Sequence, residues 1–273
     1  MKITFIGGGN MATALIAGLA GKLTAGANIH VVDPNSDQLA RLAASYGVTT
    51  AQSIGAAGAG SDVIVLAVKP QQMREVAAAL LTQLADARPL LLSIAAGIRG
   101  ADLSRWMKGY GAIVRTMPNM PALIGQGITG MVAMEGVSAA QKAAADDIMK
   151  AVGATVWLDD EALIDPVTAV SGSGPAYVFY FIEAMQQAAR ELGLSKEQGK
   201  QLALATFTGA AQMAARSPEE IAVLRERVTS KGGTTYAALT SMEASGVKQA
   251  IVEAIKAASA RGRELGEQMG AGD

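Results

Sequence analysis

Lys2-Ile-Thr-Phe-Ile-Gly-Gly-Gly-Asn-Met-Ala12 is the stretch that decides the fold. A short apolar β run ends at three glycines, and a helical pattern of apolar residues follows at once. Gly7, Gly9 and Ala12 match the pattern G-x-G-x-x-G/A between a first strand and a first helix. Gly7 permits a tight turn, and Gly9 lets a pyrophosphate approach the N–H groups at the helix start. The stretch predicts a dinucleotide-binding turn; a glycine-rich turn that only connects two packed elements is the alternative.

An acidic residue ends the second predicted strand, which covers residues 28–33 and finishes at Asp33. Its separation from the glycine turn is close to that at which a carboxylate accepts hydrogen bonds from the adenosine ribose. No Lys or Arg follows until Arg41, so the loop favours NADH over a cofactor with a 2′-phosphate. The alternative is that Asp33 starts a turn or caps a helix over residues 38–46.

Further strands alternate with helices along the first part of the chain. Apolar runs predict them over residues 61–67, 89–94, 111–117, 127–134 and 154–158. Repeated strand–helix units imply a mostly parallel, doubly wound sheet. We therefore predict an α/β protein with a Rossmann-type dinucleotide-binding domain over residues 1–160.

Candidate ligand-binding positions lie where the predicted strands end, because open α/β sheets bind ligands there. Lys69 follows Ala67 and Val68 at one such end, and a solvated loop lysine is the alternative. Ala95 follows the next strand; a small residue there permits the close approach of a flat ring, or only fills space in an Ala-rich chain. Asn119 lies in a loop that two prolines hold rigid.

The pattern changes after residue 160, where helix signals replace strands. A long helix is predicted to begin at Gly174 and to end before Gly193. Ser195 and Ser217 each begin a predicted capping box of a further helix. Four aromatic residues within positions 177–181 are spread around the long helix, which favours a surface covered by another subunit over a helix buried in its own domain. We predict an all-helical dimerisation domain over residues 161–273.

Composition excludes several classes of function. The chain has 273 residues, a net charge of −1 and a pI near 6.0, so no nucleic-acid-binding face is expected. It has no Cys and one His, His30, which leaves no thiol nucleophile and no His-rich metal site. Uncharged stretches at 116–134 and 166–182 are broken by Gly and Pro, so we expect no membrane span and a cytoplasmic protein.

A second glycine turn lies near the end of the chain, at Val228-Thr-Ser-Lys-Gly-Gly-Thr-Thr-Tyr236. Its hydroxyl groups and two glycines lead directly into a helix that starts near Thr234. This arrangement repeats the anion-binding features of the N-terminal turn, and the flanking hydroxyls suit a carboxylate. The alternative is a single Thr that only caps the helix.

The chain resembles the pyrroline-5-carboxylate reductase family over nearly its whole length. The resemblance is carried by residues 5–12, 67–71, 117–121, 172–177 and, most specifically, 228–239, which resembles the signature segment of that family. The chain departs from the pattern of that family at three places. Lys231 replaces a common Pro, Met120 replaces the usual Thr, and a few extra residues precede Leu224.

The resemblance implies NAD(P)H-dependent reduction of 1-pyrroline-5-carboxylate to L-proline, the last step of proline biosynthesis. It also implies a homodimer through the helical domain, often assembled further into a decamer. The strand-end motifs and the resemblance together place NADPH or NADH against Gly7, Gly8, Gly9, Asn10, Met11, Asp33, Ala67, Val68, Lys69, Ala95 and Asn119. By the resemblance, the substrate would be held by Ser230, Gly232, Gly233, Thr234 and Thr235. We assign Thr235 as the catalytic hydroxyl, which would hydrogen-bond the ring nitrogen as it becomes an amine.

Two other functions stay open. A β-hydroxyacid dehydrogenase shares the two-domain plan but places a catalytic Lys on the first interdomain helix, and residues 175–192 contain no Lys. A module that only senses the dinucleotide would bind the cofactor without chemistry, and it would leave the turn at residues 228–236 without a role. No metal is expected in any of these functions.

Overall fold

The chain folds into two compact units in the computed structural model, which describes residues 1–55, 60–84 and 88–271. Unit 1 comprises Met1–Ser173 and Ala258–Asp273, and unit 2 comprises Gly174–Ala257. The chain therefore passes between the units twice, once in each direction.

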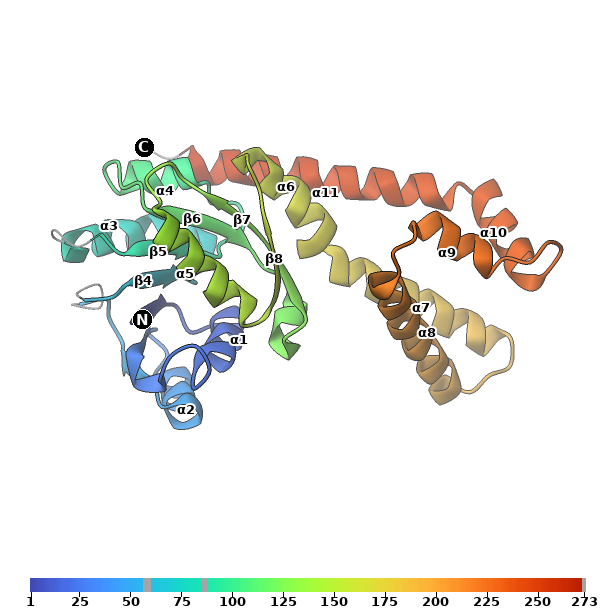
Figure 1. The fold of residues 1–273 in the computed structure, drawn as a ribbon, viewed down its shortest axis with the longest axis horizontal. Helices are drawn as coiled ribbons and strands as arrows, with labels where there is room; N and C mark the ends of the chain where they lie inside the picture. Colours follow the sequence, from blue (N-terminus) through green and yellow to red (C-terminus); the bar gives the residue numbers. More distant parts are fainter. Residues whose placement is uncertain (56–59, 85–87, 272–273) are drawn as a thin grey trace. The chain divides into compact units, whose positions relative to one another are not determined.

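Unit 1 is built on one sheet, which has eight strands in the part of the chain that the structure describes (Figure 1). The strands lie in the order β3-β2-β1-β4-β5-β6-β7-β8, and every neighbouring pair is parallel except β6 and β7. The chain order reverses at β1, where β2 lies on one side and β4 on the other, as in a doubly wound fold. The strands are β1 (Ile3–Ile6), β2 (Ile29–Val32), β3 (Thr49–Ala51), β4 (Val63–Leu66), β5 (Leu90–Ser93), β6 (Ile113–Met117), β7 (Gly127–Ala133) and β8 (Gly153–Trp157).

Helices pack on both faces of this sheet, because each buried strand presents alternate side chains to opposite faces. Ile3 and Phe5 of β1 belong to the hydrophobic cluster of one face, and Ile6 belongs to the cluster of the other. The first face is covered by α1 (Asn10–Leu19), α2 (Ser36–Tyr46) and α5 (Ala139–Lys150), and the second by α3 (Met73–Leu84) and α4 (Gly100–Trp106). The Rossmann-type fold predicted from the sequence is confirmed.

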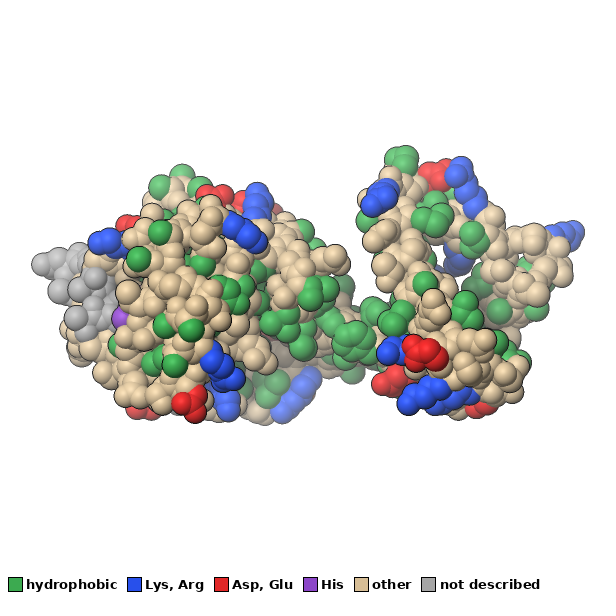
Figure 2. All heavy atoms as spheres, turned by 90° about the horizontal axis from the view of Figure 1, so that it is seen from below, with side chains coloured by type: hydrophobic (Ala, Val, Ile, Leu, Met, Phe, Trp, Pro, Cys, Tyr) green, Lys and Arg blue, Asp and Glu red, His purple; other side chains and the backbone are tan. Residues whose placement is uncertain are grey.

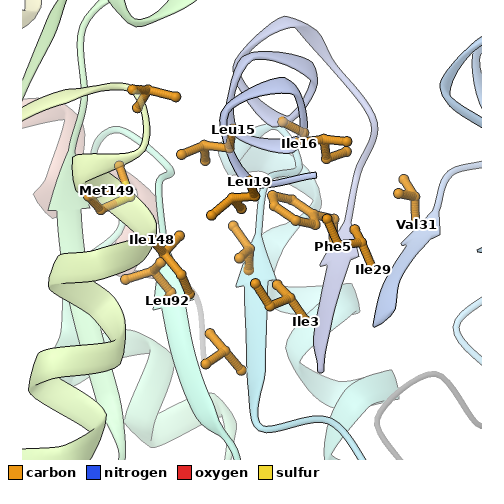
Figure 3. Packing of buried hydrophobic residues seen from close by; sticks show 14 of the residues in the cluster. Ile3, Phe5, Leu15, Ile16, Leu19, Ile29, Val31, Leu92, Ile148 and Met149 are labelled. Atoms are coloured by element: carbon orange, nitrogen blue, oxygen red, sulfur yellow. The ribbon is translucent and has the colours of Figure 1, made fainter. Parts of the chain in front are cut away.

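The larger cluster joins β1, α1 and α5 (Figure 3). Phe5, Leu15 and Leu19 have no exposed surface, and Ile148 of α5 packs into the same cluster. Burial of each such side chain stabilises the fold by about 1.5–3 kcal/mol. This packing holds α1, and therefore the glycine turn before it, against the sheet.

Gly7 is required by backbone geometry. Its φ is +102°, and a Cβ at this position would lie 2.6 Å from the carbonyl oxygen of Ala67. Its N–H donates to the carbonyl oxygen of Val32 at 2.7 Å. The turn after β1 therefore lies tightly between the ends of β2 and β4, and only glycine fits there.

A run of three short helices leads to the end of the first segment of unit 1 at Ser173. It consists of η4 (Glu161–Leu163), α6 (Ile164–Val167) and the π-helix η5 (Thr168–Gly172). The second passage lies inside one helix, α11 (Val247–Gly270), whose last part from Ala258 belongs to unit 1. Both passages therefore lie within helical segments.

Unit 2 is helical and buries very little. It contains α7 (Gly174–Glu191), α8 (Lys196–Arg216), α9 (Ile221–Arg227), α10 (Thr234–Ala244) and the first part of α11. All its residues are described, and only Ile182, Gly199 and Ala203 are buried. Figure 2 shows hydrophobic side chains at its surface. Because so small a core cannot offset the entropy of ordering the chain, this unit needs a partner surface.

Of the two capping boxes predicted at helix N-termini, the structure contains one. The capping box at Ser195 is confirmed, since its Oγ accepts from Gln198 N at 3.2 Å and Gln198 Oε1 accepts from Ser195 N at 2.9 Å. The prediction of a capping box at Ser217 is wrong. Ser217 ends α8 and accepts from Glu219 N at 3.1 Å, and α9 begins after Glu220 without a side-chain cap. A short serine turn competes with the cap there.

The short strand β3 was not predicted, because its three residues are exposed or half-buried and carry no apolar run. Among the helices that the structure describes, none is long and apolar enough to cross a lipid bilayer.

Candidate active site

A cavity of about 590 Å³ opens at the carboxyl ends of β1, β2 and β4. This is where the order of the strands reverses, the usual ligand position in open α/β sheets. The volume lies within the range of about 300–1,000 Å³ that is typical of cofactor and small-molecule sites. Its wall includes six residues that the sequence predicts for cofactor binding: Gly7, Gly9, Asp33, Ala67, Val68 and Lys69.

The start of α1 fits a pyrophosphate. Gly9 is the N-cap residue, with extended φ and ψ of −66° and −174°, and none of the described side chains caps the helix. A Cβ at Gly9 would meet no atom within 4 Å, so the space in front of the helix start is open. Uncapped N–H groups and the positive end of the helix dipole favour an anion there. Gly8, Asn10 and Met11 complete the predicted loop around this position.

Asp33 is held in place by the backbone around it. Its Oδ2 accepts from Gly8 N at 2.8 Å, and its Oδ1 accepts from Asn35 N at 2.9 Å. Asp33 therefore does start a turn, as one alternative expected. It does not cap α2, because the N-cap is Asn35, whose side chain accepts from Asp37 N and Gln38 N. The carboxylate remains in the cavity wall, where ribose hydroxyls could reach it.

We expect Asp33 to control the choice between NADH and NADPH. Replacing it by Ser, together with Ser36→Arg, should shift the ratio of kcat/KM about tenfold towards NADPH, because a cation would replace the repelling carboxylate. Ser36 is preferred to Asn35 for the arginine, since Asn35 caps α2. Initial rates with both cofactors measure the ratio. The control combines Asp33→Ser with Ala40→Arg. It keeps the first change but places the arginine further along the same helix, at an exposed position. An unchanged ratio would mean that Asp33 does not contact the ribose.

Three further predicted residues lie at strand ends with different surroundings. Lys69 is exposed beside the cavity, so a solvated lysine and a cofactor contact both stay possible. Ala95 is buried just after β5 and does not line this cavity. Asn119 is buried; its Nδ2 donates to Ser171 O at 3.1 Å and its Oδ1 accepts from Ile128 N at 3.0 Å. These bonds give Asn119 a structural task that the sequence did not reveal.

Gln38 was missed by sequence reasoning. Its Nε2 donates to Gly8 O at 2.7 Å and to Thr13 Oγ1 at 3.1 Å. It therefore ties α2 to the glycine turn and the start of α1. The only signal in the sequence was its place in the helix after Asp33, which does not distinguish it from other polar residues there.

The second glycine turn lies in unit 2 and repeats the geometry of the first. Gly233 is the N-cap residue of α10, with φ −81° and ψ 178°, and no described side chain caps this helix. The alternative of a Thr cap is therefore wrong. Gly232 has φ +73°, which favours glycine. A Cβ at Gly233 would lie 2.6 Å from Ser230 Oγ, so the serine hydroxyl lies close against the helix start.

Two hydroxyl groups flank the start of α10, where the N–H of Gly233 donates to Ser230 O at 3.0 Å and the uncapped N–H groups follow Gly233. Ser230 is exposed, and Thr235 is half-buried in the first turn of α10. A carboxylate fits this combination of a helix N-terminus and a serine hydroxyl. Thr235 adds a group that can both donate and accept a hydrogen bond.

Among the residues that the structure describes, no group of three or more His, Cys, Asp or Glu side chains could hold a metal ion. His30 lies at the second residue of β2, with its Nδ1 2.9 Å from Thr49 Oγ1. Partial burial lowers the pKa of His30, which favours the neutral ring. It lies outside the cavity at the strand ends.

The Rossmann sheet and its open glycine turn define a dinucleotide-binding protein. Residues 2–97 match a family model described as NADP oxidoreductase, coenzyme F420-dependent. Residues 161–265 match the model for pyrroline-5-carboxylate reductase dimerisation. The class is therefore a nicotinamide-dependent oxidoreductase with a helical dimerisation region.

Relatives of the whole chain narrow this class. Pyrroline-5-carboxylate reductase of Pseudomonas aeruginosa is 48% identical over 269 residues, with 98% of each chain covered. The structure of a pyrroline-5-carboxylate reductase from Coxiella burnetii is 40% identical, with a TM-score of 0.91 over 97% of this chain and 98% of that one. The Plasmodium falciparum enzyme with NADP bound is 30% identical, with a TM-score of 0.86 over the same shares. The chain belongs to the pyrroline-5-carboxylate reductase family, which confirms the resemblance found in its motifs.

Proposed function

We propose that this chain reduces 1-pyrroline-5-carboxylate to L-proline with NADPH or NADH, the last step of proline biosynthesis. The observation that carries the proposal is 48% identity to a pyrroline-5-carboxylate reductase along 98% of the chain. The structure supports it with two helices, α1 and α10, that each begin at a glycine without a side-chain cap. One suits the pyrophosphate of a dinucleotide, and the other suits the carboxylate of the substrate.

The proposed reaction depends more on positioning the substrate than on general acid–base catalysis. The cofactor, when bound, supplies the hydride. Ser230 and the N–H groups that follow Gly233, beginning with that of Thr234, hold the substrate carboxylate, and Thr235 hydrogen-bonds the ring nitrogen. The nitrogen of the imine can arrive protonated, so no strong general acid is required. Correct orientation of the ring carbon then accounts for most of the rate.

The test is an assay with the purified protein, reduced cofactor and pyrroline-5-carboxylate. We expect loss of the reduced-nicotinamide absorbance and formation of an equal amount of proline. Turnover of a β-hydroxyacid with oxidised cofactor, and none of the imine, would favour the dehydrogenase alternative. Cofactor binding without any turnover would favour the sensing module.

We infer a functional division at residue 160. Residues 1–160 would bind the dinucleotide, and residues 161–273 would bind the substrate and form the dimer. The match to the dimerisation model, which begins at residue 161, supports this division. The proposed surroundings are the cytoplasm, with no nucleic-acid or membrane partner.

We expect an obligate homodimer, assembled further into a decamer of five dimers. Phe179, Tyr180 and Leu192 of unit 2 are 60%, 73% and 83% exposed, and apolar surface of this extent is stabilised by a partner subunit. Light scattering at micromolar concentration should give a mass that is an even multiple of the chain. A stable, active monomer would contradict the dimer, and a dimer that does not assemble further would contradict the decamer alone.

A further inference from the structure

The turn after β5 follows a strand that lies next to the cavity-forming strand β4. β5 is the neighbour of β4, whose end forms part of the cavity wall, and the turn carries Ala95 and Gly97 before α4 begins at Gly100. Ligands of open α/β sheets lie beyond the carboxyl ends of such strands. None of the described residues of this turn lines the cavity itself, but the family resemblance places Ala95 against the cofactor, so on the proposed function this turn would help to hold the dinucleotide beyond its pyrophosphate.

The end of α11 lies beside α4 (Figure 1), and it packs against this turn. A Cβ at Gly266 would lie 3.3 Å from Arg99 Nε and 3.5 Å from Gly97 O. A Cβ at Gly97, whose φ is +75°, would lie 3.3 Å from Met269 Sδ. Gly266 is the one buried residue of α11. The helix and the turn are therefore in close backbone contact, which a side chain at Gly266 would disturb.

Polar contacts reinforce this packing. The Arg99 guanidinium donates to Arg263 O at 3.4 Å and lies 3.7 Å from the Glu267 carboxylate. Arg105 of α4 donates to Gly270 O at 2.5 Å, near the end of the same helix. Arginines therefore bind carbonyl oxygens and a carboxylate in the last turns of α11, where the helix dipole favours cations.

The same neighbourhood also anchors the other connection to unit 2. Glu161 Oε1 accepts from Gly100 N at 2.6 Å and from Arg115 at 2.9 Å. A Cβ at Gly262 of α11 would lie 3.7 Å from Asp165 Oδ1. Both chain passages are therefore fixed to unit 1 around the start of α4.

We propose that Arg99 is a positioning residue for hydride transfer, because it clamps the end of α11 onto the turn that carries Ala95. All these contacts lie within unit 1. Loosening the clamp therefore loosens the turn after β5. The pyrophosphate position at α1 depends on other contacts and stays intact. The inference rests on the function proposed above.

The experiment compares Arg99→Ala, Arg99→Lys and Gly266→Leu with the unaltered full-length protein, whose own turnover tests the proposed function separately. Arg99→Ala should lower kcat about tenfold with the cofactor KM within about twofold, since small misplacements cost rate rather than remote binding. A deuterated cofactor should show a larger isotope effect on kcat in Arg99→Ala, because hydride transfer becomes slower. Gly266→Leu should reproduce both changes, and Arg99→Lys should recover most of the rate.

Arg261→Ala is the matched control. Arg261 also lies on α11 and pairs with Glu264 at 2.8 Å, but this pair stays on the helix surface. It should leave kcat and the isotope effect unchanged. The proposal is overturned if Arg99→Ala and Gly266→Leu keep the kcat and isotope effect of the unaltered protein, or if Arg261→Ala loses as much. Absence of turnover by the unaltered protein would overturn the proposed function and this inference with it.

Discussion

Replacing Thr235 by alanine should lower kcat by about 10²-fold, the range for losing one positioned polar group in an active site. Thr235 is half-buried in the first turn of α10, directly after the uncapped glycine turn. We expect its hydroxyl to bond the ring nitrogen as the imine becomes an amine, an interaction that strengthens in the transition state. Cofactor affinity should not change, since the cavity proposed for the cofactor is lined by residues of unit 1. Steady-state kinetics with a separate cofactor-binding titration measures both quantities.

Three further variants test this prediction. Thr240→Ala removes the same atoms from an exposed position on the same helix and should keep full activity. Ser230→Ala should chiefly raise KM for the substrate, because carboxylate binding is made in the ground state and the transition state alike. His30→Gln should leave activity intact. Full kcat in Thr235→Ala with no activity in a well-folded His30→Gln protein would place the active site elsewhere.

Much of unit 1 could be predicted because its signals are local. The glycine turn, Asp33 and Lys69 follow the apolar runs of β1, β2 and β4, so strand ends and residues of the cavity wall were predicted together. Parallel strands bring such ends to one edge of the sheet, which is why distant motifs meet in one cavity. The start of α10 near Thr234 was predicted in the same way, from two adjacent glycines that lead directly into a helical pattern.

Contacts between distant residues could not be predicted in this way. The side-chain amide of Asn119 bonds Ser171 O and Ile128 N, and nothing near Asn119 in the sequence indicates these partners. The N-terminus of α4 is satisfied by Glu161, which lies 61 residues later, rather than by a local capping residue. Residues 159–161 are all acidic, so the sequence does not tell which carboxylate turns inward. Such choices depend on packing that only the folded chain determines.

Glu161→Ala should lower the free energy of unfolding of unit 1 by about 3 kcal/mol, because it leaves a buried cation without its main partner. The side chain of Arg115 is only 5% exposed, and its Nη1 lies 2.9 Å from Glu161 Oε1. Asp165 Oδ1, at 4.0 Å, replaces this contact only in part. The same change frees the N–H of Gly100 at the start of α4. Urea unfolding followed by circular dichroism measures the difference.

Two comparisons decide whether the unpaired cation of Arg115 causes the expected loss in the free energy of unfolding. Glu264→Ala removes an equally short ion pair on the surface of α11 and should cost only about 0.2–1 kcal/mol. Arg115→Met combined with Glu161→Leu removes both charges, and should recover most of the loss because a buried pair can be replaced by apolar side chains of similar volume. If Glu161→Ala costs no more than Glu264→Ala, Arg115 does not depend on this carboxylate. If the double variant is as unstable as Glu161→Ala, the loss comes from the freed N–H of Gly100 and the packing around it.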